Sequence, residues 1–237
     1  MIFFFKKSKL IVNAFISENY SAVFNTAPIN YSHHFYPKWW KEMPKAKFDF
    51  NEMTANVNVK TCSGIIELYN RSITIPMWTD FALKIDDLGN WTYQYSDLES
   101  KLQTHSLSQR GNFKTEYVHF KHISPWLIQS EKDVYFNFVP DYYNLDDLDV
   151  DFLSGVVEYY HQHGSNINFM VRKGYKEIMM SYGQPLIQIF PLCEKEIELR
   201  THMVSYNELI SMGQKSRKVN FVNNYQKLKK CPLGFGK

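Results

Sequence analysis

Short runs of β-branched and aromatic residues dominate the second half of the chain. They occupy residues 126–128, 134–139, 155–160, 167–171, 175–180 and 186–190, and most are separated by glycine, proline, asparagine or aspartate. Short strands at this spacing are typical of an antiparallel β-sandwich, either a jelly roll or a double-stranded β-helix. Residues 194–203 continue the pattern, and we expect the main sheets to be built from residues 73–95 and 115–203.

The first half contains further strand patterns. Residues 2–5, 10–16 and 20–24 are enriched in the same residue types, which predicts short strands there. Residues 81–95 contain two runs of β-forming residues around an Asp-Asp-Leu-Gly-Asn turn, and this arrangement predicts a hairpin. Residues 96–112 are polar and lack a clear period, so we expect a loop with one short helix at most.

Helical patterns are confined to a few segments. Residues 62–71 carry apolar side chains at helical spacing and predict a helix. Trp39 and Trp40 lie between two prolines, which predicts a single helical turn that rests on a hydrophobic floor. Residues 205–229 predict a C-terminal helical region in two pieces, with a break at Gly213.

The composition supports one compact, mainly β domain. The chain has 237 residues, of which 44% are hydrophobic and 16% aromatic, and it contains no repeat or linker strong enough to divide it. A chain of this length buries enough apolar surface for a stable core, and the abundance of aromatic residues favours sheet over helix. We therefore predict a single domain over residues 1–237, mainly β with a few helices, including the C-terminal helical tail.

Three cysteines and the absence of a long apolar run limit the class of protein. Cys62, Cys193 and Cys231 are far apart in the sequence, so they predict neither a disulfide framework nor a cysteine-based zinc site. The apolar residues at the N-terminus precede the first lysines, which is the reverse of a signal peptide. No run of 18 uncharged apolar residues occurs, so we expect no membrane span and a reducing compartment.

The net charge of +3 is unevenly distributed. Seven lysine and arginine residues and no acidic residue follow Glu208, whereas residues 133–171 contain seven acidic residues and no lysine or arginine. The tail can pair with the acidic stretch, present a solvated helix face or contact an acidic partner. Because only Arg217 among the seven suits bidentate contacts to guanine, we predict no specific binding to nucleic acid.

A pair of histidines is the clearest motif with metal chemistry. Gly155, His161 and His163 have the spacing of a Gly-x5-His-x-His sequence, and two histidines at i and i+2 of a strand point to one face. The motif resembles the first metal motif of cupins, which implies that His161 and His163 bind a divalent metal. Asn168 stands near the position of the cupin glutamate. The alternative interpretation is a turn between two strands.

Other catalytic motifs are absent from the sequence. There is no Gly-x-Ser-x-Gly elbow, Walker lysine, dinucleotide-binding glycine pattern or His-x-Asp pair with a distal histidine. The sequence therefore gives no support to standard hydrolase, kinase, dehydrogenase or iron-oxygenase functions.

Several blocks resemble an uncharacterised family of tailed bacteriophages and bacteria. They are residues 124–129 with 138–144, residues 154–158 and residues 174–191, together with residues 35–44, 61–64 and 75–80, which look like the versions carried by marine T4-like phages. The resemblance implies a phage-encoded auxiliary protein located in the host cytoplasm or the virion. No activity comes with it.

The blocks also contain the candidate binding residues. Trp78, Asp80, Trp126 and Glu158 pair flat aromatic surfaces with carboxylates, as a ligand-binding cleft does. We expect a β-sandwich that binds a small molecule or a phage or host protein and that can form homo-oligomers. The alternatives are a cupin-like metal-dependent enzyme that uses His161 and His163, and a virion or assembly protein; the four candidate residues can equally belong to the core and its turns.

Overall fold

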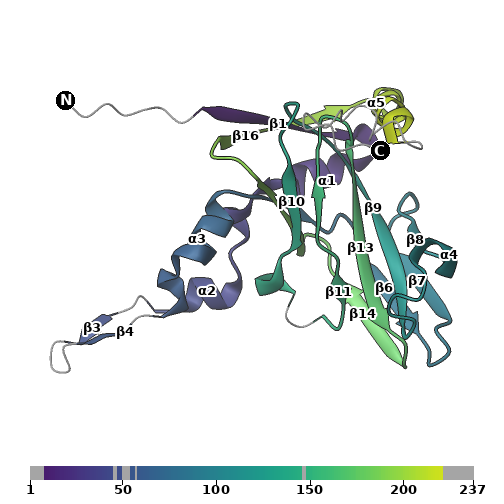
Figure 1. The fold of residues 1–237 in the computed structure, drawn as a ribbon, viewed down its shortest axis with the longest axis horizontal. Helices are drawn as coiled ribbons and strands as arrows, with labels where there is room; N and C mark the ends of the chain where they lie inside the picture. The colour runs from purple at the N-terminus through teal and green to yellow at the C-terminus, as the bar shows by residue number, and fades with distance from the viewer. Residues whose placement is uncertain (1–7, 45–46, 50–53, 57, 146–147, 221–237) are drawn as a thin grey trace, which may run out of the picture.

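The structure is a computed structural model that describes residues 8–44, 47–49, 54–56, 58–145 and 148–220 (Figure 1). Its largest sheet has six strands, in the order β11-β13-β9-β1-β16, with β8 paired to the remaining length of β9. The strands are β1 (Lys9–Ser17), β8 (Leu102–Thr104), β9 (Tyr117–Gln129), β11 (Asp151–Phe152), β13 (Gly164–Arg172) and β16 (Glu196–Val204). β1 and β16 are parallel in register from Lys9–Glu196 to Ser17–Val204, and the other pairs of this sheet are antiparallel.

Two smaller antiparallel sheets complete the β part of the fold. The five-stranded sheet has the order β12-β10-β15-β5-β2, with β12 (Gly155–Val157), β10 (Phe136–Pro140), β15 (Pro185–Pro191), β5 (Ile73–Pro76) and β2 (Asn30–Tyr31). The three-stranded sheet has the order β14-β6-β7, with β14 (Lys176–Met180), β6 (Phe81–Ile85) and β7 (Trp91–Tyr95). β3 (Lys47–Asp49) and β4 (Thr54–Asn56) form a separate ribbon.

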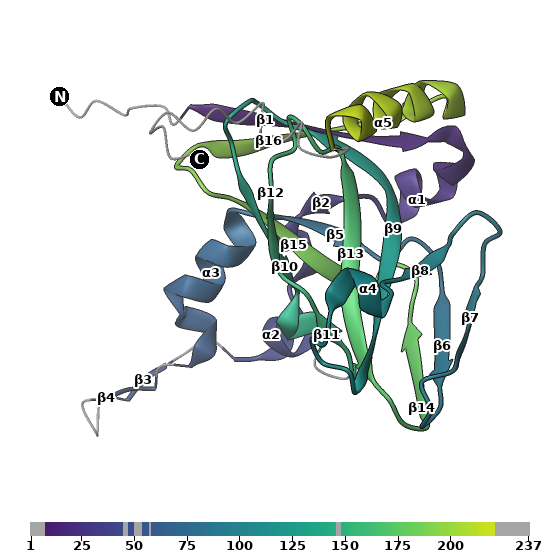
Figure 2. The same cartoon turned by 45° about the vertical axis from the view of Figure 1, so that its right-hand side comes forward.

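Short helical segments connect the strands. They are η1 (Glu18–Tyr20), α1 (Ser21–Thr26), η2 (Ser32–Phe35), α2 (Lys38–Glu42), η3 (Val59–Thr61), α3 (Ser63–Asn70), α4 (Leu107–Arg110), η4 (Tyr142–Asn144) and α5 (Tyr206–Asn220). Figure 2 shows α2 and α3 on one side of the molecule, α5 beside β1, and the three-stranded sheet on the opposite side. None of the helices within the described ranges is long and apolar enough to cross a membrane.

The alternation of side chains along the strands builds the main core. Leu10, Val12, Ala14 and Ile16 of β1 are all 0% exposed, because every second residue of a strand points to the same face. Phe81 of β6 lies edge-on to Phe169 of β13, and Trp91 of β7 lies edge-on to Phe120 of β9, so the three-stranded sheet packs on the six-stranded one. A mainly β sandwich with a few helices and a C-terminal helix, as predicted, is confirmed.

A second cluster holds the helical part. Trp40, Ile65 and Tyr69 are buried together, and partly buried Tyr36 and Tyr143 pack against them. α2 is the predicted helical turn between the two prolines, and α3 confirms the predicted helix at 62–71.

Three local predictions were wrong. The segment 96–112 contains the strand β8 as well as the short helix α4, because Leu102–Thr104 pair with β9 in a contact that the local sequence does not show. Residues 20–24 lie in η1 and α1 and not in a strand, because Ser17 Oγ accepts a hydrogen bond from the backbone N–H of Asn19 and starts helical winding. α5 continues through Gly213, because a single glycine inside a helix costs only about 1 kcal/mol and does not by itself end it. The predicted strand at 2–5 and the end of the predicted tail fall outside the described residues.

The acidic stretch finds partners within the body of the protein. Asp151 accepts a hydrogen bond from Lys114 Nζ at 3.1 Å, and Asp149 pairs with Lys176. Asp141 is fully buried, next to the helical cluster. The charged side chains of the basic tail lie outside the described residues, so its pairing stays a prediction.

Candidate functional site

Trp78 and Trp126, two of the four predicted binding residues, lie in the core. Trp78 is 3% exposed, and its indole N–H donates to Ser100 Oγ at 2.8 Å. Trp126 is 0% exposed, its ring lies 6.4 Å from that of Phe24, and its indole nitrogen has no hydrogen-bond partner among the described residues. Neither ring presents a flat surface to solvent.

Asp80 and Glu158 lie apart from each other. Asp80 is exposed, and its carboxylate accepts the backbone N–H of Tyr182 at 2.8 Å. Glu158 is 2% exposed, and its Oε1 accepts the backbone N–H of Asp133 at 3.1 Å. Of the hollows described below, Asp80 lines one and Glu158 none. The structure does not bring the four residues together, and their role in binding stays a prediction without geometric support.

His161 and His163 lie in the turn between β12 and β13. His161 Nε2 is 3.8 Å from Glu158 Oε1. His163 Nδ1 is 3.4 Å from Gln129 Nε2 and its Nε2 is 3.3 Å from the carbonyl oxygen of Tyr160, and burial lowers the pKa of this imidazole. Within the described residues no group of three or more His, Cys, Asp or Glu side chains is placed to hold a metal ion. The described residues therefore place the carboxylate of Glu158 near the imidazole of His161, but they do not supply the three or four ligands that a metal site needs.

The outer face of the three-stranded sheet is exposed and borders hollows in the surface. Cross-strand register places Glu177, Lys84 and Thr92 in one row, and all three are exposed. The next row contains Met179, which is 65% exposed, and Gln94. Three hollows border this sheet. Two of them lie over its outer face: one is lined by the row of Glu177, Lys84 and Thr92, and the other by the row of Met179 and Gln94.

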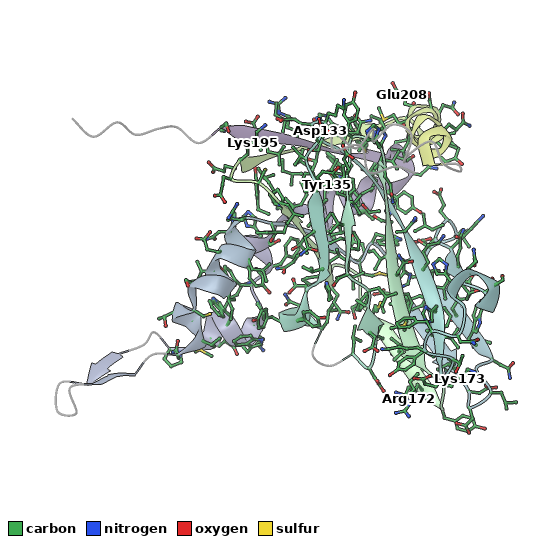
Figure 3. All side chains as sticks on the ribbon, viewed as in Figure 1. Asp133, Tyr135, Arg172, Lys173, Lys195 and Glu208 are labelled. Carbon is green, nitrogen blue, oxygen red and sulfur yellow. The ribbon has the colours of Figure 1, made fainter. Side chains whose placement is uncertain are left out.

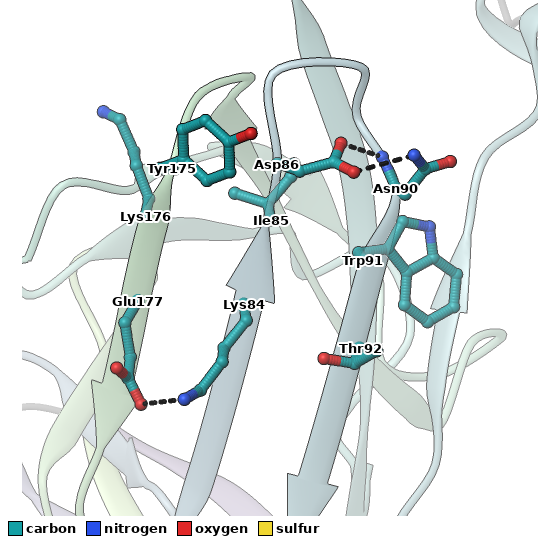
Figure 4. Close-up of a pocket in the computed structure, with 9 residues that line it drawn as sticks. All are labelled: Lys84, Ile85, Asp86, Asn90, Trp91, Thr92, Tyr175, Lys176 and Glu177. Atoms are coloured by element: carbon teal, nitrogen blue, oxygen red, sulfur yellow. Dashed lines mark hydrogen bonds and ion pairs between the residues drawn. The ribbon is translucent and has the colours of Figure 1, made fainter.

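The groove at the hairpin end of the sheet is the candidate site. It has a volume of about 440 Å³, and Figure 4 shows Tyr175 and Trp91 at its two sides with Asp86 and Asn90 between them. The lining residues are Lys84, Ile85, Asp86, Asn90, Trp91, Thr92, Tyr175, Lys176 and Glu177. They come from the β6–β7 hairpin and from β14 with the residue before it, and the pairing of β14 with β6 brings this distant segment beside the hairpin.

Two glycines allow the loops around the groove to meet. Gly89 has φ +84°, a left-handed conformation that strains other residues, and it lies against the side chain of Lys173. The backbone N–H of Gly174 donates to the carbonyl oxygen of Asp86 at 3.1 Å. Figure 3 shows Arg172 and Lys173 at the end of β13, where the chain turns towards β14. The hairpin turn and the β13–β14 turn therefore form one ordered rim.

The polar groups of the groove are fixed in pairs. Asp86 Oδ1 accepts the backbone N–H of Asn90 at 2.8 Å, and Oδ2 accepts its Nδ2 at 2.7 Å. These bonds from Asn90 lower the pKa of Asp86, so this carboxylate is ionised at neutral pH. Lys84 Nζ lies 3.3 Å from Glu177 Oε1, and Lys176 pairs with Asp149. Each charge in the lining thus has a partner of opposite sign or a fixed set of hydrogen bonds.

The aromatic groups differ in burial. Tyr175 is 85% exposed. Trp91 is partly buried, because its ring lies edge-on to Phe120 with centroids 5.6 Å apart and 5.7 Å from the ring of Tyr93. The exposed ring of Tyr175 can contact a molecule bound on the outer face, whereas the ring of Trp91 lies on the core side of the sheet against Phe120.

Sequence reasoning missed this groove. Its signals were a strand that begins with Trp91 directly after an aspartate- and glycine-containing turn, and Tyr175 next to a glycine. Nothing in the sequence shows that the two segments meet, because β14 pairs with β6 across more than ninety residues of chain.

Two buried polar groups lie outside the groove. Asp141 is 0% exposed; its Oδ1 accepts the hydroxyl of Tyr69 at 2.8 Å and its Oδ2 accepts Nδ2 of Asn144 at 3.0 Å, while burial raises its pKa to about 6. His122 is 0% exposed, its Nδ1 lies 2.5 Å from the hydroxyl oxygen of Tyr95, and burial lowers its pKa to about 3. Both groups are enclosed by packed side chains, so they serve the fold and do not form an accessible site.

Comparisons with protein-family models, with curated proteins and with solved structures find no match for this chain.

Proposed function

We propose that this protein is a ligand-binding β-sandwich that holds an uncharged, polyhydroxylated ligand, a carbohydrate, in the groove over β14, β6 and β7. The observation that carries the proposal is the 85% exposed ring of Tyr175 beside a groove whose charged side chains compensate one another.

Sugars match this mixture of surfaces. The C–H face of a pyranose ring is apolar and packs on an aromatic ring, while its hydroxyl groups both donate and accept hydrogen bonds. Tyr175 offers the aromatic surface. Asn90 Oδ1 and Thr92 Oγ1 are accessible hydrogen-bonding groups in the lining, and Lys84 with Glu177 adds a donor and an acceptor.

The charge balance of the lining favours an uncharged ligand. Lys84 and Lys176 are offset by Asp86 and Glu177, so the lining has no net charge. A site for a phosphate or a nucleic acid backbone has an excess of lysine or arginine. The groove lacks that excess.

The groove is also held in shape before any ligand binds. Strand pairing fixes the rows of side chains, and Asp86 accepts one hydrogen bond from the backbone N–H of Asn90 and one from its side-chain amide. Pre-organised polar groups lose little conformational entropy on binding, which favours affinity and specificity. Asp86 is therefore a positioning residue, and Asn90 is a contact residue.

A glycan microarray probed with the full chain, followed by isothermal titration calorimetry, tests the proposal. We expect binding to neutral oligosaccharides, weakened about tenfold or more by Tyr175→Ala, because the exposed ring supplies the apolar contact. Tyr206→Ala is the matched control; Tyr206 is 50% exposed and lies on α5, which is apart from β6, β7 and β14 (Figure 2).

A chain that binds no neutral glycan at millimolar concentration contradicts the proposal, and so does a Tyr175→Ala variant that binds as well as the native chain. Within the resemblance to tailed-phage proteins, we propose that the module is an auxiliary binding protein of the phage. Copurification with phage particles distinguishes a virion component from a protein of the host cytoplasm.

A further inference from the structure

The outer edge of β7 carries backbone groups that have no partner strand among the described residues. The N–H of Asp86 donates to the carbonyl of Asn90, and the N–H of Ser96 donates to the carbonyl of Asp80, so the even-numbered residues of β7 point their backbone groups towards β6. In an antiparallel pair the alternate residues point the other way. The N–H and C=O groups of Trp91, Tyr93 and Tyr95 therefore face away from β6, at the end of the strand order β14-β6-β7.

Other edges of the described sheets are protected. The outward N–H of Leu199 on β16 donates to the hydroxyl of Tyr31 at 3.0 Å, and that hydroxyl lies 3.4 Å from the carbonyl oxygen of Ile197. The edge strand β14 carries the charged pair Lys176 and Glu177, and β2, β11 and β12 are two or three residues long. Charge and short length are the usual means by which edge strands avoid pairing with another chain.

β7 has none of these protections. Its sequence Trp-Thr-Tyr-Gln-Tyr contains no charged residue, no proline and no glycine, and all five residues suit a strand or its exposed face. Tyr93 is 41% exposed although it lies on the side of the sheet that faces the core. An added strand would continue that apolar side and cover the ring.

We propose that β7 pairs with β7 of a second copy of this chain, antiparallel about a two-fold axis at Tyr93. This register places Tyr93 opposite Tyr93 of the second copy, Trp91 opposite Tyr95 and Thr92 opposite Gln94. Aromatic side chains then meet aromatic ones on the core side, and polar side chains meet polar ones on the outer side.

The chain is thus complementary to itself at this edge. The outward groups of Trp91, Tyr93 and Tyr95 in both copies form about six backbone hydrogen bonds, and no like charges oppose each other. The result is a continuous six-stranded sheet made of two β14-β6-β7 units. Because the two-fold axis is perpendicular to that sheet, the outer faces of both units remain open on the same side. The pairing is independent of what the groove binds.

Charge substitution at Tyr93 tests the pairing. Analytical ultracentrifugation of the full chain, at concentrations on the order of 50 μM, is expected to give twice the chain mass of 28.1 kDa. Tyr93→Lys and Tyr93→Glu alone place like charges opposite each other, so each variant is expected to sediment at half the native mass. Leu88→Lys adds the same charge at the 81% exposed hairpin tip and is expected to leave the dimer intact.

Mixing the two variants supplies the decisive result. If residue 93 faces itself, an equimolar mixture of Tyr93→Lys and Tyr93→Glu regains the dimer, because lysine then lies opposite glutamate. A native chain that stays monomeric at this concentration overturns the proposal, even if its edge captures another protein. Dimeric single variants, or a mixture that stays monomeric while both variants are folded by circular dichroism, also overturn it.

Discussion

Asp141 is a carboxyl group enclosed by its hydrogen-bond partners and the aromatic cluster of the helical part. The hydroxyl of Tyr69 and the amide of Asn144 each donate to one of its oxygens. Asn144 Nδ2 also lies 2.9 Å from the carbonyl oxygen of Phe35, so one carboxyl group and one amide connect η2, α3 and η4. Burial outweighs these hydrogen bonds and raises the pKa of Asp141 to about 6.

The raised pKa makes stability depend on pH. Because the pKa is about 6 in the folded protein and 3.8 for an ordinary aspartate, the folded state binds the proton more tightly than the unfolded chain does. The contribution to the free energy of unfolding is complete below pH 3.8 and is lost as the pH rises through 6, a change on the order of 3 kcal/mol. Asp141→Asn removes the titrating group, so we expect this loss to disappear.

Urea denaturation of both proteins between about pH 4 and pH 7 measures the effect. Asp151→Asn, which changes a carboxylate paired with Lys114 on the surface, is expected to keep the native pH profile. If the native and Asp141→Asn profiles are parallel over this range, Asp141 is ionised in the folded protein and the prediction is wrong.

Helices α2 and α3 are attached to the β-sandwich by one aromatic cluster. The ring of Tyr36 stacks on Tyr69 at 4.4 Å and on Trp40 at 5.3 Å, and the indole N–H of Trp39 donates to the carbonyl oxygen of Tyr143 at 3.2 Å. The hydroxyl of Tyr69 adds the bond to Asp141. The attachment thus combines ring packing with several hydrogen bonds, among which the bond from Tyr69 to Asp141 is buried.

Removal of that contact is expected to loosen the helices without unfolding the sheets. Tyr69→Phe keeps the ring but leaves Asp141 short of one donor, which costs about 1–3 kcal/mol. We expect hydrogen exchange in α2 and α3 to become about tenfold faster, with β1 and β9 unchanged. Tyr36→Phe is the control, because the Tyr36 hydroxyl makes no hydrogen bond within the described residues. Equal exchange in both variants argues against a role for the Tyr69 bond.

The sequence predicted elements where one local pattern decides the outcome. The hairpin of β6 and β7 has its own turn residues, and α3 has its own apolar face. The prediction of a strand at residues 20–24 was wrong. Val23 and Phe24 suit a strand, while the capping by Ser17 that starts the helical turn is a weak signal in the sequence. Trp78 and Trp126 were predicted to line a binding cleft because the resemblance blocks contain them together with carboxylates, yet the sequence does not show which rings face the core.

The groove was beyond sequence reasoning for a different reason. Tyr175 comes next to Asp86 only because β14 pairs with β6, and the order of strands in a sheet is a property of the whole fold. The same holds for Asp141 and Tyr69, which are 72 residues apart. Local patterns supply the strands, and tertiary packing decides which strands become neighbours.

The topology of the whole molecule sets the order in which it can fold. β1 lies between β9 and β16 in the large sheet, so its pairing requires segments from opposite ends of the described chain. Contacts between distant segments carry a larger entropic cost than local ones. We expect the hairpin of β6 and β7 to form first and the β1–β16 pair last.

Pulsed hydrogen exchange during refolding from urea tests this order. Amides of β6 are expected to gain protection before those of β1 and β16, which are expected to gain it together. Protection of β1 before the hairpin would contradict the expected order. Amides of β9 that face β13 serve as the internal reference, since those two strands are closer together in the chain.

The parallel pairing of β1 and β16 also determines how the protein responds to mechanical force. The nine register pairs run from Lys9–Glu196 to Ser17–Val204, and both strands point the same way. Tension between the segment before Lys9 and the segment after Val204 pulls the strands lengthwise past each other, so the evenly spaced hydrogen bonds carry the load together. A hairpin such as β6–β7, pulled at its two open ends, releases one pair at a time. The large sheet is therefore built to withstand traction along these two strands.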